Sequence, residues 1–219
     1  MSSGRAHSRP LKVKICGITS AGDALAAVHA GADAIGLIFH PGSPRAVTVK
    51  QAREIADALP PFIVAVGVFV NAGERQVRDT LADAGLDAAQ LHGDEPPELV
   101  TKLGRRAYKA LQIRSRSELD RLDLYPGPVL LDGWSGTARG GTGSRIPASL
   151  AKAARSRLAR QKRHLILAGG LAPDNIVEAV EAVDPWAIDV NSGVEASPGK
   201  KDPRKIAELF RILRAERLI

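Results

Sequence analysis

The sequence alternates eight times between an apolar segment of strand length and an amphipathic segment of helix length. We expect strands at residues 12–16, 34–39, 62–70, 88–92, 107–113, 129–132, 165–168 and 186–190. We expect helices at residues 21–30, 50–59, 74–84, 95–103, 116–122, 148–160, 173–183 and 203–218. Several apolar segments lack polar alternation, which is typical of strands buried on both faces of a parallel sheet.

This repeated order, without a break in composition, favours one closed domain. Eight strand–helix units in 219 residues fit the α/β class and predict a single (β/α)8 TIM barrel. The alternative is an open doubly wound sheet, which usually carries a Gly-rich turn after its first strand. Residues 16–19 read Cys-Gly-Ile-Thr instead, and no Walker loop is present. We predict a mobile N-terminal arm at residues 1–10 and a barrel at 11–219.

The ends of several expected helices carry local signals. Thr48, Asp94 and Asp202 stand where an N-cap is expected, because a short polar side chain can accept a hydrogen bond from a free N–H of the first turn. Pro173 and Pro203 stand in the first turn of their helices, where proline is tolerated.

The composition excludes several classes of protein. An apolar content of 44% is enough for a real core, and no apolar run reaches the roughly 20 residues of a membrane helix. The N-terminus is polar and basic, unlike a secretory signal. A single cysteine excludes an internal disulfide. We therefore expect a cytoplasmic protein with no membrane partner.

The net charge of +7 is concentrated in part of the chain. Residues 133–173 contain eight lysines or arginines and no acidic residue. The basic segment 152–163 is interpreted as the outer face of one helix, and an anion-attracting patch remains the alternative. A nucleic-acid site would also need aromatic groups for stacking. Only 4% of residues are aromatic and none lies in that segment, so no nucleic-acid partner is predicted.

Polar residues follow the expected strands at their carboxyl ends, where barrel enzymes build their active sites. The residues at these positions are Cys16, His40, Arg45, Gln90, His92, Asp132 and Asp189. Small residues gather at the same ends, where glycine lets backbone N–H groups approach an anion closely. Because barrels often bind phosphate after strands seven and eight, we predict phosphate binding by Gly169, Gly170, Ser192 and Gly193. The glycine cluster after the sixth strand adds Gly141 and Gly143 to this prediction.

Seven segments, in order along nearly the whole chain, resemble the phosphoribosylanthranilate isomerase family. They are KICGIT (14–19), GADAIGLIFHPGSPR (31–45), VGVFVN (66–71), QLHGDE (90–95), LLD with GGTG (130–132 and 140–143), LAGGL (167–171) and DVNSGVEASPGKKD (189–202). Any one of them is a weak signal, but the combination is specific.

The resemblance implies an Amadori rearrangement of N-(5′-phosphoribosyl)anthranilate in tryptophan biosynthesis. The substrate would be a phosphorylated small molecule, and no cofactor, metal ion or obligate protein partner is implied. The family match makes Asp132 the general acid that protonates the furanose ring oxygen and Cys16 the general base that removes the C2′ proton. A general acid at neutral pH needs a raised pKa. A thiolate needs a positive neighbourhood, which Lys14 can supply if it shares an inward face with Cys16.

The resemblance also assigns the substrate contacts. Arg45 matches the arginine that binds the anthranilate carboxylate, for which a guanidinium fork is suited. Gln90, His92 and Asp189 match polar residues that line the pocket. The chain departs from the family pattern in the loop 133–147, where Trp134 is a candidate for stacking on the anthranilate ring.

Two other functions stay open at this level. The first is a histidine-pathway or dual-substrate isomerase of similar shape, but such enzymes carry an aspartate at the end of the first strand, where this chain has Cys16. The second is a non-catalytic protein that binds anions or nucleic acid through the basic segment 152–163.

Overall fold

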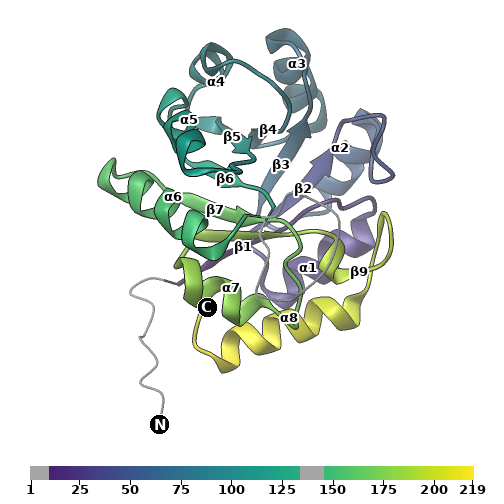
Figure 1. The fold of residues 1–219 in the computed structure, drawn as a ribbon. Helices are drawn as coiled ribbons and strands as arrows, with labels where there is room; N and C mark the ends of the chain where they lie inside the picture. Colours follow the sequence, from purple (N-terminus) through teal and green to yellow (C-terminus); the bar gives the residue numbers. More distant parts are fainter. Residues whose placement is uncertain (1–9, 134–145) are drawn as a thin grey trace.

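The computed structural model describes residues 10–133 and 146–219. Within these residues the eight expected strands form one closed parallel barrel, with β8 hydrogen-bonded to β1. The helices lie around the outside of the barrel (Figure 1). The predicted (β/α)8 TIM barrel is therefore confirmed. The predicted arm at residues 1–10 lies outside the described residues except for Pro10, and stays a prediction.

The observed elements lie within a few residues of the expected ones. The barrel strands are β1 Lys12–Ile15, β2 Ala34–Ile38, β3 Val64–Phe69, β4 Ala88–Leu91, β5 Ala107–Leu111, β6 Val129–Leu131, β7 Leu165–Ala168 and β8 Ala187–Val190. The α-helices are α1 Ala21–Ala30, α2 Val49–Asp57, α3 Glu74–Ala84, α4 Pro97–Leu103, α5 Arg121–Leu124, α6 Ala148–Arg160, α7 Ile176–Val183 and α8 Pro203–Ala215. The 3-10 helices are η1 Gly104–Arg106, η2 Arg116–Asp120 and η3 Ser192–Val194.

Three of the expected helix signals are confirmed. Thr48 caps α2 in a capping box with Gln51, whose side chain returns a bond to the backbone of the cap. Asp202 caps α8 by accepting a hydrogen bond of 2.9 Å from the N–H of Arg204. Pro203 occupies the first turn of α8, as expected. Local chemistry therefore fixes where these two helices begin.

Two expected helix starts are wrong. Asp94 does not cap α4, which begins only at Pro97, because a proline disfavours helical backbone in the residue before it. Pro173 precedes α7 rather than lying in its first turn. The turn before α7 is held by Asn175, whose amide donates a hydrogen bond of 2.8 Å to the carbonyl of Gly170, so the helix begins after it.

The sheet separates two apolar cores. The larger core lies between the strands and the helices, and includes fully buried side chains from every layer such as Phe69 and Phe210. The smaller core fills the inside of the barrel with Val66, Tyr108, Ala110, Leu130, Ile166, Ala168 and Ala187. Because several of these inward residues are alanines, the barrel has room for long polar side chains in the layer above them.

A short antiparallel hairpin follows η3 and was not expected from the sequence. It pairs β9 Glu195–Ser197 with β10 Lys200–Lys201. Gly199 in its turn has φ +81, and a Cβ there would lie 2.8 Å from the carbonyl of Pro44. The hairpin therefore packs closely on the loop after β2, which carries Arg45.

Within the described parts of the chain, no helix combines the length and the apolar character needed to cross a bilayer.

Candidate active site

A cavity of about 280 Å³ opens at the carboxyl ends of the barrel strands. It is lined by Cys16, Ile38, Val68, Gln90, His92, Asp132, Ala168, Gly169, Gly170, Leu171, Asp189, Asn191 and Ser192. Eight of the predicted site residues thus meet in one place. Arg45 and Gly193 lie outside the lining, and Gly141 and Gly143 lie outside the described residues.

Cys16 and Lys14 share the inward face of the first strand, as their spacing predicted. Both pack against Gly36 of β2, where a Cβ atom would lie 2.7 Å from the Cys16 sulfur and 3.0 Å from the Lys14 Nζ. Glycine at this position therefore makes room for the thiol and the ammonium group side by side.

Replacing Gly36 by alanine is expected to lower kcat by about 10- to 100-fold, because the added methyl displaces the thiol and the ammonium from their positions. The free energy of unfolding is expected to fall by only about 1–3 kcal/mol. Kinetics and thermal unfolding of the same preparation measure both effects. Gly73→Ala is the matched control, because nothing lies within 4 Å of a Cβ at Gly73. Equal kcat in the two variants would contradict this prediction.

The expected positive groups lie close to Cys16, but they do not lower the pKa of its thiol below the ordinary value. Burial and the Asp189 carboxylate raise the pKa of the thiol, while Lys14 and Lys201 lower it. The net pKa lies above that of an ordinary thiol, so the thiol is protonated at neutral pH. The surroundings of Cys16 alone therefore do not give the expected thiolate.

Alkylation of Cys16 by iodoacetamide is expected to be slow at neutral pH and to accelerate as the pH rises. Because the pKa of the thiol is raised, the midpoint of this rise should lie above that of free glutathione. The protein has a single cysteine, so intact-mass spectrometry reports this site alone. A midpoint below that of glutathione would mean that the lysines outweigh burial.

A buried polar network crosses the barrel beneath the cavity. The Lys14 Nζ donates hydrogen bonds of 2.7 Å to Asp189 Oδ2 and 2.8 Å to Gln90 Oε1. The Tyr108 hydroxyl donates a third bond, of 3.0 Å, to the same Gln90 oxygen. The charge of Asp189 outweighs the burial of Lys14 and raises the pKa of its ammonium, so Lys14 stays protonated. The predicted pocket residues Gln90 and Asp189 are thereby linked.

The same network continues to Asp132. Gln90 Nε2 lies 2.9 Å from His92 Nδ1, and His92 Nε2 lies 3.2 Å from Asp132 Oδ2. Burial raises the pKa of Asp132, but the hydrogen bond from His92, with further hydrogen bonds, outweighs burial. The net pKa is lowered, so the expectation of a raised pKa is wrong. A carboxyl that donates a proton there needs additional negative charge close to it.

Arg45 is held by a partner that the sequence analysis did not consider. Its Nε and Nη2 donate hydrogen bonds of 2.7 Å each to the two carboxylate oxygens of Glu195. Lys201 donates a bond of 3.1 Å to Glu195 as well. Burial alone raises the pKa of Glu195, but these two cations lower it below its ordinary value. The guanidinium group of Arg45 therefore faces a carboxylate of the protein itself.

The loops after β7 and β8 meet at the rim of the cavity. Gly169 and Gly170 have φ values of +93 and +63, which favour glycine. A Cβ at Gly193 would lie 2.0 Å from the carbonyl of Leu171, so only glycine fits between the two loops. Asn191 accepts a hydrogen bond of 3.0 Å from Lys201, which ties the second loop to the hairpin. Close backbone packing thus shapes the predicted phosphate site.

The sequence analysis did not identify three polar residues of this region. Tyr108, Glu195 and Lys201 are all buried and polar, and none stood at a strand end that the sequence analysis considered. Tyr108 and Lys109 are adjacent polar residues in a strand that is otherwise apolar. Because neighbouring side chains of a strand point to opposite faces, one of the two must face the inside of the barrel, and this pattern could have identified Tyr108. The pairing of Glu195 and Lys201 depends on the hairpin, which no sequence pattern indicated.

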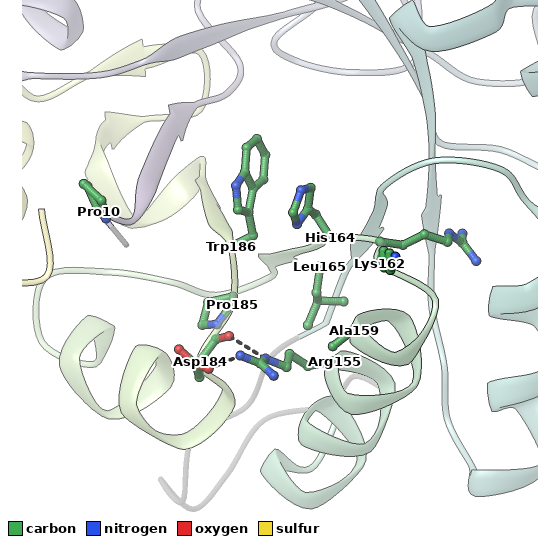
Figure 2. Close-up of a pocket in the computed structure, with 10 residues that line it drawn as sticks. Pro10, Arg155, Ala159, Lys162, His164, Leu165, Asp184, Pro185 and Trp186 are labelled. Atoms are coloured by element: carbon green, nitrogen blue, oxygen red, sulfur yellow. Dashed lines mark hydrogen bonds and ion pairs between the residues drawn. The ribbon is translucent and has the colours of Figure 1, made fainter. Parts of the chain in front are cut away.

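A second cavity, of about 530 Å³, lies at the opposite end of the barrel (Figure 2). Its lining includes Arg155 from the basic segment 152–163 and the stacked rings of His164 and Trp186. Arg155 is paired with Asp184, and Arg157 of the same helix donates to Asp123, which lowers the pKa of that carboxyl to about 2. These arginines neutralise carboxylates of the protein, which favours the interpretation of the segment as a helix face.

Among the residues that the structure describes, no group of three or more His, Cys, Asp or Glu side chains is arranged to hold a metal ion.

Comparison with known proteins agrees with this geometry. The family model of N-(5′phosphoribosyl)anthranilate (PRA) isomerase matches residues 13–211. An N-(5′-phosphoribosyl)anthranilate isomerase of Geobacter sulfurreducens is 50% identical over 202 residues, which span 92% of this chain and 97% of the relative. The relative from Geobacter metallireducens is 48% identical, spanning 94% of this chain and 100% of its own.

Solved structures give the same result. The phosphoribosyl anthranilate isomerase of Thermotoga maritima superposes with a TM-score of 0.84 at 41% identity, over 94% of this chain and 99% of the other. A phosphoribosyl anthranilate isomerase in complex with reduced 1-(o-carboxyphenylamino)-1-deoxyribulose 5-phosphate superposes with a TM-score of 0.83 at 40% identity, with the same coverage. The chain therefore belongs to the N-(5′-phosphoribosyl)anthranilate isomerase family.

Proposed function

We propose that Cys16 and Asp132 are the general base and general acid with which this isomerase rearranges N-(5′-phosphoribosyl)anthranilate. The product is 1-(o-carboxyphenylamino)-1-deoxyribulose 5-phosphate, an intermediate of L-tryptophan biosynthesis. The observation that carries the assignment is that the thiol and the carboxyl line one cavity, at the barrel end where such enzymes react.

Each step of the reaction has a group suited to it. Asp132 donates a proton to the ring oxygen as the C1′–O bond breaks, and the nitrogen lone pair forms the Schiff base. Cys16 then removes the C2′ proton, and the electron pair of that C–H bond neutralises the nitrogen and leaves an enol-amine. Tautomerisation moves a proton to C1′ and gives the ketone. The sequence is redox-neutral and needs two groups that exchange protons with substrate.

Cys16 and Asp132 together hold the one proton that this scheme needs, but not on the group that the scheme needs to carry it. The pKa of the Cys16 thiol is raised and that of the Asp132 carboxyl is lowered, so the one proton they hold rests on sulfur. The reaction needs that proton on the carboxyl. The substrate brings a phosphate and a carboxylate, and their negative charge raises the pKa of a nearby carboxyl, while Lys14 favours the thiolate. We infer that substrate binding brings about the exchange.

The remaining site residues would hold the substrate. Gly169, Gly170, Ser192 and Gly193, together with Gly141 and Gly143, are proposed to bind the phosphate through backbone N–H groups. Arg45 is proposed to bind the anthranilate carboxylate. Because its fork already pairs with Glu195, the substrate carboxylate has to replace or share that partner. The close packing of Arg45 on Gly17, the residue after Cys16, supports its nearness to the reacting atoms.

Location and partners are proposed in the same way. The substrate is a water-soluble phosphorylated metabolite, and we propose that the enzyme acts on it in the cytoplasm without an obligate protein or nucleic-acid partner.

The decisive experiment follows the fluorescence of freshly prepared phosphoribosylanthranilate after addition of the purified protein. The fluorescence is expected to fall at a rate proportional to enzyme concentration. The histidine-pathway aminoaldose is assayed in parallel and is expected not to react, because that activity uses an aspartate where this chain has Cys16. A protein that consumes only the histidine-pathway compound would overturn the proposal.

A further inference from the structure

We infer that Tyr108 is a positioning residue for the isomerase reaction, which it serves by fixing the Gln90 amide so that His92 presents its N–H to Asp132. Nothing in the motif pattern identifies Tyr108. The inference rests on the proposed role of Asp132 and adds the device that orients it.

The argument starts at the Gln90 oxygen, which receives two hydrogen bonds. The Lys14 ammonium donates from 2.8 Å and the Tyr108 hydroxyl from 3.0 Å. An ammonium has donors only, so the end of the amide that faces it must be the carbonyl oxygen. The hydroxyl of Tyr108 occupies the second lone pair, and burial raises the pKa of the phenol, which keeps its proton for donation.

The orientation of the amide then decides the tautomer of His92. With its oxygen turned to Lys14 and Tyr108, Gln90 presents its NH₂ group to His92 Nδ1 at 2.9 Å. An NH₂ group can only donate, so Nδ1 must be the acceptor, and the neutral imidazole carries its proton on Nε2. That N–H points at Asp132 Oδ2, 3.2 Å away.

The consequence reaches the carboxyl proposed as the general acid. The hydrogen bond from His92 Nε2 holds the Asp132 carboxyl by one oxygen and sets its direction toward the cavity. If the amide turned over, His92 would be left with its Nε2 lone pair facing Asp132, and the two acceptors would repel each other. Tyr108 therefore acts at a distance, through Gln90 and His92, on the group that exchanges a proton with substrate.

The barrel interior allows this role because the side chain of Tyr108 is packed and cannot turn away. Its ring lies in the inner core with small neighbours such as Ala110 and Ala168, and the residue is buried. Substituting phenylalanine keeps the ring and removes only the hydroxyl. The variant separates hydrogen bonding from packing.

Tyr108→Phe is expected to lower kcat by about fivefold, the value of one neutral hydrogen bond, with KM changed by less than about twofold. The matched control is Tyr125→Phe, because Tyr125 is also buried and donates one hydrogen bond, to the Glu95 carbonyl outside this network. The control is expected to lose stability but not kcat. Equal kinetic loss in both variants would overturn the inference.

The second readout does not depend on activity. In protein with ¹⁵N-labelled histidine, the nitrogen shifts of neutral His92 are expected to report the Nε2–H tautomer in the wild type. In Tyr108→Phe, where Lys14 alone still holds the Gln90 oxygen, a minor share of the Nδ1–H tautomer is expected to appear. An unchanged tautomer in the variant would overturn the inference. If the wild type failed to isomerise the substrate, the proposed function would fail while the tautomer result still stood.

A third variant tests whether the effect passes through Gln90. Gln90→Glu places acceptors toward Lys14, Tyr108 and His92 alike, so His92 is expected to carry its proton on Nδ1 and kcat to fall further than in Tyr108→Phe. Adding Tyr108→Phe to this variant is expected to cause no additional loss. Full additivity of the two losses would mean that Tyr108 acts by another route.

Discussion

Cys16→Ala is expected to lower kcat for phosphoribosylanthranilate by about 10²–10⁴-fold, the usual contribution of a general base. The thiol is the only sulfur nucleophile of the chain and lines the cavity beside Lys14, so its removal takes away the group proposed to accept the C2′ proton. Substrate affinity is expected to change little, because the phosphate and carboxylate contacts lie elsewhere. Steady-state kinetics with an independent measurement of substrate affinity separates the two effects.

Two further variants sharpen this test. Cys16→Ser keeps the size of the side chain but supplies a far weaker base, so it is expected to behave like the alanine variant. Ile15→Val removes a buried methyl group from the adjacent residue, which faces the outer core, and should cost only about 0.5–1.5 kcal/mol of stability. A Cys16→Ser enzyme with near-normal kcat would refute the assignment of the base.

Asp132→Asn is expected to reduce kcat by a comparable factor, about 10²–10⁴-fold, because an amide cannot give a proton to the ring oxygen. The substitution preserves the shape of the carboxyl, and the amide oxygen of asparagine can still accept the hydrogen bond that His92 gives to Asp132 Oδ2. The loss is therefore expected in the chemical step, visible as slow single turnover with bound substrate. Normal single-turnover rates would exclude Asp132 as the acid.

The matched control for this charge removal is Asp33→Asn at the opposite end of the barrel. Asp33 accepts a hydrogen bond of 2.9 Å from the N–H of Val13 and pairs with Lys12, away from the cavity. Its substitution is expected to leave kcat unchanged and to lower only the thermal midpoint of unfolding.

The barrel and the meeting of most predicted site residues in one cavity followed from the sequence because both rest on local rules, whereas the roles of Cys16 and Asp132 came from the family resemblance. A strand places alternate side chains on opposite faces, so the spacing of Lys14 and Cys16 predicts that they share one face. The carboxyl ends of parallel strands share one rim, which brought Gln90, His92, Asp132 and Asp189 to one cavity. These residues are far apart along the chain, and the fold alone joins them.

The features that the sequence analysis did not predict depend on which side chains pair with one another, and the local pattern of residues does not reveal this. The fork of Arg45 is engaged by Glu195 across 150 positions of the chain, and the sequence offered no way to choose that partner. The pKa of Asp132 depends on the sum of burial and the hydrogen bond from His92, whose balance only geometry determines. The start of α7 was displaced by the side chain of Asn175, a local signal that was overlooked.

The closure of the barrel between β1 and β8 has a consequence for synthesis of the protein. The N–H of Cys16 donates a hydrogen bond of 2.8 Å to the carbonyl of Val190, so Cys16 and the loop after β8 become neighbours only when the eighth strand docks on the first. A chain cut short before β8 lacks this contact and also lacks Asp189, which lines the cavity, and is therefore expected to be inactive.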